Sequence, residues 1–298
     1  MVGAAAAVVR AGPLPLCHEE SLYRHAPPAC CGAPRTVRVT TALLVGVTFR
    51  SMDFVCLAAG HGTRLGRLGR YLQKCMYPVG LKPFLEHSLV QLVACRGTVT
   101  GDRLALVVGH HAHQVKSYFG QAFEGLPIVY VDQEERLGTG HALTLAYRQL
   151  EPRSGMVGWQ ADLFVTESMF EAVIAHPADT VVTLGPGAAG EAAVLRATVV
   201  GDRVTRVWDG VGPLYDVGLW KLSSAVLAEI GEARAPTGEV RMLMNMQRSI
   251  DAGAFVGHVE CSEWIHLGGT LPTAEENVDA VVAKVLAIGR RQTRLERA

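Results

Sequence analysis

Short apolar runs alternate with longer amphipathic segments over most of the chain. The run DFVCLAA at residues 53–59 is apolar almost throughout, which is typical of a strand buried on both faces of a sheet. The pair Gly201-Asp202, between two further runs, predicts a hairpin of residues 194–200 and 204–208. The other predicted strands are residues 104–108, 127–131, 156–159 and 180–184.

Helical patterns fill the intervals between these strands. Leu85, Leu89 and Leu92 recur at helical spacing directly after Lys82-Pro83, so we expect a helix to open at this pair. The other expected helices are residues 139–150, 239–250 and 272–286. This alternation predicts an α/β fold with a mostly parallel central sheet flanked by helices.

The beginning of the chain has a different composition. Residues 1–51 contain no Lys, Asp, Asn, Gln or Ile, and no apolar period of a strand or helix runs through them. We therefore expect a poorly ordered extension at residues 1–51 and one domain at residues 52–298. Our hypothesis is that Met52 is the natural translation start.

Charge and cysteine content narrow the functional classes. The chain carries 28 basic and 28 acidic residues, so we expect no binding of nucleic acid or of an anionic membrane. No run approaches the roughly 18 apolar residues that a membrane span requires. The seven cysteines are odd in number and include no C-x-x-C pair, which argues against a disulfide framework and a zinc site. We expect a cytoplasmic protein with reduced thiols and leave self-association open.

The segment LAAGHGTRLGRLGRYLQKCMYPVGLKPFLEH, residues 57–87, carries the candidate chemistry. It continues a predicted buried strand, and ligands of open α/β sheets bind beyond the carboxyl ends of strands. Gly60 and Gly62 let backbone N–H groups approach an anion. The cations of the segment that suit phosphate include Arg64, Lys74 and Lys82. We therefore predict a phosphate-rich ligand.

Two familiar phosphate-binding loops do not fit this segment. The dinucleotide fingerprint G-x-G-x-x-G fails because Leu65 stands at its third glycine position. The P-loop pattern G-x-x-x-x-G-K-[ST] occurs nowhere in the chain.

The motif L-A-A-G-x-G-T-R, followed by K-x-x-x-P-V-x-x-K-P, resembles the signature of the sugar-nucleotide pyrophosphorylases. QEERLGTGHA at residues 133–142 is similar to the family's Q-x-x-x-L-G-T-A-H-A, and residues 215–219 and 264–270 resemble two later family segments. The likeness spans nearly all of residues 53–290. It implies a Rossmann-like nucleotidyltransferase domain that uses Mg²⁺, an NTP and a sugar 1-phosphate.

The resemblance also implies roles for individual residues. Arg64, Lys74 and Asp162 would be catalytic, with Lys74 at the α-phosphate and Asp162 on Mg²⁺. Asp209 and Gly218 would lie on the sugar side, and His266 falls on the position of the second metal ligand. The residues expected to bind the nucleotide are Leu57, Ala58, Ala59, Gly60, Gly62, Thr63, Lys82, Gln133, Gly138 and Thr139.

This chain departs from the family pattern at several positions. Gln73 replaces the proline before the lysine, and Ala161 replaces the glycine before the aspartate. Asp209-Gly210 stands where many relatives carry a Glu-Lys pair whose lysine binds the sugar phosphate, and Lys221 or Arg206 is the candidate substitute. His266 replaces the second metal aspartate, and imidazole suits borderline metals better than Mg²⁺.

The predicted function is transfer of NMP from an NTP to a sugar 1-phosphate, or to a sugar-like phosphate, with release of pyrophosphate. One alternative is a cytidylyltransferase that acts on a non-sugar phosphate such as phosphocholine. A second is a non-catalytic regulatory protein that binds nucleotide sugars. The nucleobase and the acceptor stay open, because Gln133 can bond several base edges and a fold does not fix a substrate.

Overall fold

The computed structural model describes residues 51–96, 102–187, 195–231, 233–262, 264–267 and 282–288, without the side chain of Arg64. Nearly all of the predicted extension, residues 1–51, lies outside these ranges, as do residues 272–281 of the last predicted helix. Residues 282–288 are helical.

Eight of the described strands form one sheet in the order β13-β9-β12-β7-β1-β4-β6-β5. Strand β1 is parallel to β4 and β7, β4 is parallel to β6, and β13 is parallel to β9. Strand β12 runs against both of its neighbours, and β5 runs against β6. The strands are β1 (Asp53–Ala58), β4 (Arg103–Val108), β5 (Ala122–Phe123), β6 (Leu126–Asp132), β7 (Met156–Gln160), β9 (Val181–Pro186), β12 (Leu214–Leu222) and β13 (Gly257–Glu260).

Three short strand pairs lie outside this sheet. They are β2 (Pro78–Val79) with β3 (Lys82–Pro83), β8 (Leu163–Phe164) with β14 (Ile265–His266), and β10 (Thr198–Val200) with β11 (Arg203–Arg206). The pair of β8 and β14 matters for the site because it places residue 266 close to the end of β7.

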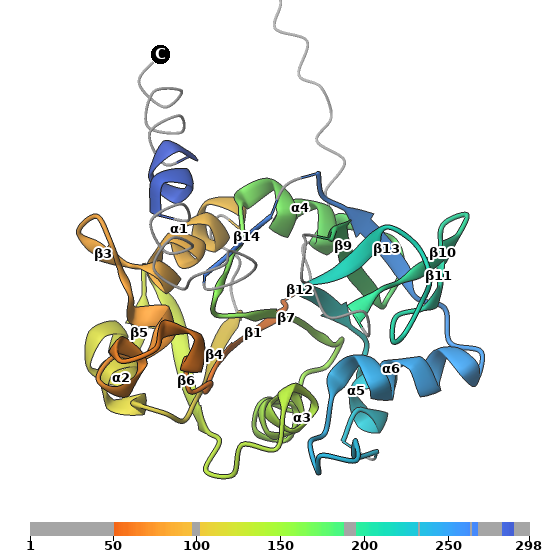
Figure 1. Cartoon of the computed structure of the whole chain (residues 1–298), viewed down its shortest axis with the longest axis horizontal. Helices are drawn as coiled ribbons and strands as arrows, with labels where there is room; N and C mark the ends of the chain where they lie inside the picture. The colour runs from red at the N-terminus through yellow and green to blue at the C-terminus, as the bar shows by residue number, and fades with distance from the viewer. Residues whose placement is uncertain are drawn as a thin grey trace, which may run out of the picture. The chain divides into compact units, whose positions relative to one another are not determined.

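Helices cover both faces of the large sheet (Figure 1). Helices α1 and α4 lie on one face, and α3, α5 and α6 lie on the other. None of the described helices is long and apolar enough to cross a bilayer. The α-helices are α1 (Phe84–Arg96), α2 (Ala112–Phe119), α3 (Thr139–Leu150), α4 (Glu167–Ala175), α5 (Ser224–Glu229) and α6 (Met242–Asp251).

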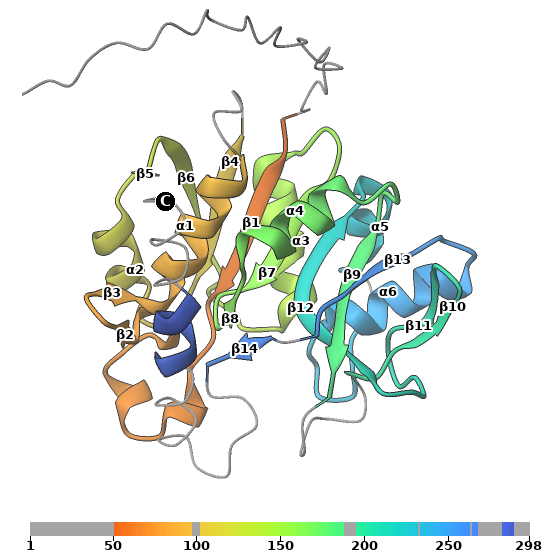
Figure 2. The same cartoon turned by 90° about the horizontal axis from the view of Figure 1, so that it is seen from above.

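Strand β1 lies at the centre of the sheet (Figure 2), and its side chains alternate between two cores. Phe54, Cys56 and Ala58 pack with the α1 and α4 layer, whereas Val55 packs with the α3, α5 and α6 layer. All four side chains are at most 2% exposed. Burial on both faces explains why the run is apolar almost throughout.

The order in which the chain fills the sheet defines where a ligand binds. From β1 the chain goes to β4 and β6 on one side and then returns to β7 on the other side of β1. In open α/β sheets the crevice at such a reversal, beyond the carboxyl ends of the strands, receives the ligand. Leu57 of β1 stands opposite Gln160 of β7, so the loops that follow these two residues share that crevice.

The α/β fold predicted from the sequence is confirmed, with small differences at element ends. Lys82-Pro83 does not open helix α1, because it forms the second strand of the β2–β3 pair and the helix starts at Phe84. Helix α6 starts at Met242 and not at Glu239, because the N–H of Val240 bonds the carbonyl of Leu137 at 2.5 Å. At both helix starts, hydrogen bonds to other segments of the chain override the helical tendency of the local sequence.

Candidate active site

The loop after β1 turns sharply at Gly62, which adopts the left-handed backbone region with φ 62°. A Cβ at this position would be strained and would lie 3.0 Å from Cβ of Lys74. Gly69 packs against the same turn, where a Cβ would lie 2.5 Å from the carbonyl oxygen of Gly62. At Gly60 a Cβ would meet nothing within 4 Å. The glycines therefore allow a tight loop at residues 62 and 69 and leave the backbone of Gly60 open to a ligand.

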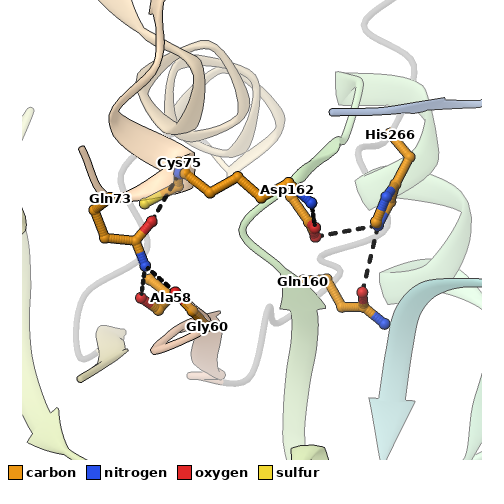
Figure 3. Close-up of polar contacts among 8 residues, drawn as sticks. Ala58, Gly60, Gln73, Cys75, Gln160, Asp162 and His266 are labelled. Carbon is orange, nitrogen blue, oxygen red and sulfur yellow. Dashed lines mark hydrogen bonds and ion pairs between the residues drawn. The ribbon is translucent and has the colours of Figure 1, made fainter. Parts of the chain in front are cut away.

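Gln73 connects this loop to the segment that carries Lys74 (Figure 3). Its amide nitrogen donates to the carbonyl oxygens of Ala58 and Gly60, the second at 3.2 Å, and its amide oxygen accepts from the N–H of Cys75 at 2.9 Å. The residue is 2% exposed. Its φ of −64° is the value that a proline ring imposes. The backbone at Gln73 is therefore compatible with a proline, and the glutamine side chain adds hydrogen bonds that a proline cannot make.

The residues at the start of α2 and just before it also hold the segment that leads to Lys74. His110 Nε2, His111 Nε2 and Gln114 Nε2 lie 3.0, 3.0 and 2.7 Å from the successive carbonyl oxygens of residues 69–71. Oε1 of Gln114 accepts from the N–H of Gln73 at 2.8 Å. His110, His111 and Gln114 therefore support the loop. Within the described part of the chain, no group of three or more His, Cys, Asp or Glu side chains can hold a metal ion.

Lys74 forms an ion pair with Asp162, the second residue after the end of β7. Figure 3 labels Asp162 and its other partner, His266. The other carboxylate oxygen lies 3.1 Å from Nε2 of His266 on β14. This nitrogen is also 3.3 Å from Oε1 of Gln160, so it faces two acceptors and carries the proton. Burial alone would raise the pKa of the Asp162 carboxyl, but His266 and Lys74 outweigh it and hold that pKa well below its ordinary value. Asp162 is therefore an anion with two cationic or donor partners.

Cys75 lies beside this pair but is not a candidate nucleophile. Its thiol is 1% exposed, and burial together with the charge of Asp162 raises its pKa to about 12. A thiol of that pKa is protonated at neutral pH and unreactive.

A hollow of about 390 Å³ opens at the carboxyl ends of β1 and β7. We call it the first hollow, because a second one adjoins it. Lys82 does not line it, because its ammonium lies 2.8 Å from the carboxylate of Glu86. The side chain of Arg64 lies outside the described part. The sequence-predicted residues that line it are Leu57, Ala58, Ala59, Gly60, Gly62, Thr63, Lys74, Gln133, Gly138, Thr139 and Asp162.

Gln133 lies at the inner wall of the first hollow and is 5% exposed. Its amide nitrogen is 3.1 Å from the carbonyl oxygen of Gly138 and 3.2 Å from Nδ1 of His141. Its orientation is therefore fixed before a ligand arrives. Arg136 and His61, which the sequence analysis did not single out, also line the hollow, with 2.7 Å between Nη1 and Nδ1.

A second hollow of about 300 Å³ adjoins the first. The two share Gly138, Thr139, Gln160 and Glu239 as lining residues. The remainder of the second hollow is lined by Leu195, Trp208, Asp216, Val217, Trp220, Arg241, Met242, Leu243, Trp264 and His266. This arrangement fits two substrates that meet at a common border, with Asp162 on one side and His266 on the other.

Asp216 is the buried carboxyl of the second hollow, with an exposed fraction of 7%. It accepts a hydrogen bond from Nε1 of Trp220 at 2.6 Å. Burial raises the pKa of Asp216 to about 7, although the bonds from Trp220 and from the backbone of Gly218 act in the opposite direction. Its charge therefore changes close to neutral pH.

Neither of the residues predicted for the sugar side, Asp209 and Gly218, lines one of these hollows. Asp209 is exposed, has a left-handed φ of 53°, and lines neither hollow. Gly218, with φ 99°, backs onto Gln160, whose Nε2 would lie 3.1 Å from an added Cβ. Trp208 and Arg241 line the second hollow although neither was predicted from the sequence. Their place depends on β12, which follows Trp208 and runs against its neighbours in the sheet. Local pattern carries no signal for that placement.

The donor set at the border of the hollows suits a divalent cation that shares its ligands with phosphate. Asp162 offers a carboxylate, and His266, 3.1 Å away, offers an imidazole nitrogen once Nε2 releases the proton that it donates to Asp162. Cations that bind NTPs take one or two protein ligands and complete their shell with phosphate oxygens and water. An imidazole in the pair favours borderline metals over a purely oxygen-binding ion.

Comparison with known families agrees with this geometry. A model of the MobA-like NTP transferase domain matches residues 54–229. Among curated relatives, a D-glycero-α-D-manno-heptose 1-phosphate guanylyltransferase from Aneurinibacillus thermoaerophilus is 31% identical over 137 residues, which is 45% of this chain and 58% of the relative. The bifunctional protein GlmU of Cellvibrio japonicus is 34% identical over 117 residues, covering 39% of this chain and 23% of the relative.

The chain matches less than two thirds of the length of these relatives. A third, the UTP–glucose-1-phosphate uridylyltransferase AglF of Haloferax volcanii, is 38% identical over 92 residues, which is 31% of this chain and 36% of the relative. Among solved structures, UDP-glucose pyrophosphorylase with UDP-glucose superposes with a TM-score of 0.64 at 16% identity, covering 79% of this chain and 98% of that one. The apo form of that enzyme gives a TM-score of 0.63 at 16% identity, with the same coverage. These superpositions establish the nucleotidyltransferase fold.

Proposed function

This chain belongs to the family of MobA-like NTP transferase domains, and we propose that it transfers a nucleoside monophosphate from an NTP to a sugar phosphate. The observation that carries the proposal is the ion pair of Lys74 and Asp162 at the point where the strand order reverses. A cation for phosphate and an anion for metal stand side by side there, which is the charge pattern that phosphoryl and nucleotidyl transfer require.

The reaction follows from that placement. An oxygen of the acceptor phosphate forms a bond to the α-phosphorus of the NTP, and the bond from that phosphorus to the bridging oxygen of pyrophosphate breaks. The attacking oxygen is already anionic, so no side chain has to remove a proton. Catalysis by this chain is then orientation and neutralisation of charge.

Several residues of the first hollow have a role in this scheme. The backbone of Gly60 and Gly62 holds the triphosphate, and Lys74 moves its charge from Asp162 to the α-phosphate. Gln133, fixed by Gly138 and His141, bonds the base edge. Asp162 and His266 would hold the divalent cation, Mg²⁺ in our sequence-based expectation, which when bound neutralises phosphate charge.

The function is tested by incubating the full chain with Mg²⁺ or Mn²⁺, each of five NTPs, and a panel of sugar 1-phosphates, inositol 1-phosphate and phosphocholine. Pyrophosphate release with one NTP and one sugar phosphate is the expected result. Release with phosphocholine alone would favour the cytidylyltransferase alternative. Nucleotide binding without pyrophosphate release from any pair would contradict the enzyme and favour the regulatory alternative.

A further inference from the structure

Arg241 stands in the second hollow as the only lysine or arginine among its described lining residues. If the proposed function holds, this hollow receives the acceptor, whose phosphate carries up to two negative charges. We infer that Arg241 binds the acceptor phosphate and takes the place of the lysine that is absent at Asp209-Gly210. The inference rests on the proposed function, and it names a residue and an anion class for the acceptor half of the cleft.

The other candidate cations are engaged or lie elsewhere. Lys221 donates to the carbonyl oxygen of His176 at 2.8 Å, at the end of α4, and does not line the hollow. Arg206 is exposed on β11 and lines neither hollow. Lys74 lies in the first hollow, where the α-phosphate of the NTP competes for its charge.

The guanidinium of Arg241 is held in place before a ligand binds. Its central carbon lies 5.5 Å from the ring centroid of Trp208, over the indole face. Its Nε lies 3.0 Å from the carboxylate of Glu239. A guanidinium has five N–H donors, and in the described part of the chain the terminal nitrogens of Arg241 donate to no other group. The side chain is 37% exposed, so a phosphate can reach the unused donors.

The position of Arg241 also suits attack on the NTP. Glu239, its ion-pair partner, lines both hollows. His266 lines the second hollow and contacts Asp162 of the first at 3.1 Å. A phosphate bound by Arg241 next to Glu239 would therefore lie in the part of the second hollow that adjoins the first.

The rest of the hollow indicates what carries that phosphate. Half-buried Trp208 and Trp264 provide apolar faces, and Asp216 and Glu239 provide acceptors for hydroxyl groups. A ring with an apolar face and hydroxyl edges, as in a carbohydrate or cyclitol, matches both kinds of surface. Because Arg241 already covers Trp208 with positive charge, the indole is a poor partner for a quaternary ammonium group.

The test uses the full chain with the first hollow saturated by an NTP analogue that has a methylene bridge between the α- and β-phosphorus atoms. Inorganic phosphate is then titrated by calorimetry into the wild type, Arg241→Ala, Arg241→Lys and the control Arg206→Ala. Loss of a charge-assisted contact predicts phosphate binding about tenfold to a hundredfold weaker in Arg241→Ala. Partial recovery is expected in Arg241→Lys, and the wild-type value in Arg206→Ala. The affinity for the analogue should be the same in all four proteins.

Equal phosphate affinity in Arg241→Ala and the wild type would overturn the inference, as would a wild type that binds no phosphate beside the analogue. A loss of analogue binding in Arg241→Ala would also overturn it, because Arg241 would then serve the NTP. Failure of the proposed function has a different signature. In that case phosphate binding still depends on Arg241, but no pair of NTP and acceptor releases pyrophosphate.

Discussion

The ammonium group of Lys74 is the direct ion-pair partner of the carboxylate of Asp162, 88 residues further along the chain. Both side chains are largely buried, with exposed fractions of 11% and 21%. Two buried opposite charges stabilise each other, whereas one left alone is costly. In the proposed reaction, a bound NTP would bring an anion to Lys74 and a metal ion would bring a cation to Asp162, so neither buried charge would be left without a partner.

Replacing Lys74 with alanine should abolish most turnover. We expect kcat to fall about 10²- to 10³-fold, because one preorganised charge at the reacting phosphorus is lost. Asp162 keeps its contact with His266, so the protein should still fold cooperatively. The measurement is pyrophosphate release together with a thermal melt. The control is Lys116→Ala, which removes an exposed ion pair with Asp132, and similar kinetics in the two variants would refute the role of Lys74.

Removing the amide of Gln73 should misplace Lys74 without unfolding the domain. In Gln73→Ala the bonds to Ala58, Gly60 and the N–H of Cys75 disappear. We expect kcat to fall about tenfold to a hundredfold, because small displacements of a catalytic group are that costly. The KM for NTP should change less. A matched control is Gln149→Ala, an exposed glutamine with one bond to the backbone of Tyr130 at 3.2 Å.

The variant Gln73→Pro separates backbone from side chain at this position. Its φ of −64° accepts a proline ring, but the N–H that bonds Gln114 is lost. If the backbone conformation alone positions Lys74, this variant should be far more active than Gln73→Ala. Equal activity of the two would assign the effect to the side-chain amide.

The phosphate-binding glycine loop could be predicted from local sequence, because it follows a predicted buried strand and carries Lys74 behind it. The role of Asp162 rested on the family resemblance, and the structure brings Asp162 and Lys74 together. The hydrogen bonds of Gln73 could not be predicted, since a pattern does not say where an amide points. Trp208 and Arg241 escaped notice because their place depends on β12, which runs against its neighbours, and on the late start of α6.

The two glycines at residues 60 and 69 should respond in opposite ways to an added methyl group. At Gly69 a Cβ would lie 2.5 Å from the carbonyl oxygen of Gly62, so Gly69→Ala should lose about 1–3 kcal/mol of stability from overpacking. At Gly60 the space is open, so the free energy of unfolding of Gly60→Ala should differ from that of the wild type by no more than about 0.5 kcal/mol. Its methyl group would occupy ligand space and weaken NTP binding. Denaturant unfolding and nucleotide titration distinguish the two, and a Gly69→Ala protein of wild-type stability would contradict the packing.

Asp216 should make the stability of the protein depend on pH between about 4 and 7. Its pKa is about 7 in the folded protein and near 3.8 when unfolded, so the folded state holds the proton more tightly. The contribution of Asp216 to the free energy of unfolding is therefore fully present below pH 3.8. As the pH rises to 7 this contribution is lost, which lowers the free energy of unfolding by at most ~4 kcal/mol. The neutral variant Asp216→Asn should lack this loss. Its unfolding free energy relative to the wild type should therefore increase from pH 4 to pH 7, and a constant difference would refute the raised pKa.

His266 should set the choice of metal. Its imidazole lies 3.1 Å from Asp162, at the position where the resemblance to the sugar-nucleotide pyrophosphorylases predicts a second aspartate. Nitrogen ligands favour Mn²⁺ over Mg²⁺ more than carboxylates do. To bind a cation, Nε2 must release the proton that it shares between Asp162 and Gln160. We therefore expect His266→Asp to shift preference toward Mg²⁺, with the ratio of Mn²⁺ to Mg²⁺ affinity falling about tenfold. Electron paramagnetic resonance of Mn²⁺, titrated against Mg²⁺ in the presence of the methylene analogue, measures that ratio without turnover.

The new aspartate would also face Asp162 as a like charge, so added metal should raise the melting temperature of His266→Asp more than that of the wild type. The control His113→Asp changes an exposed histidine and should leave the ratio as it is. An unchanged ratio in His266→Asp would mean that His266 only orients Asp162.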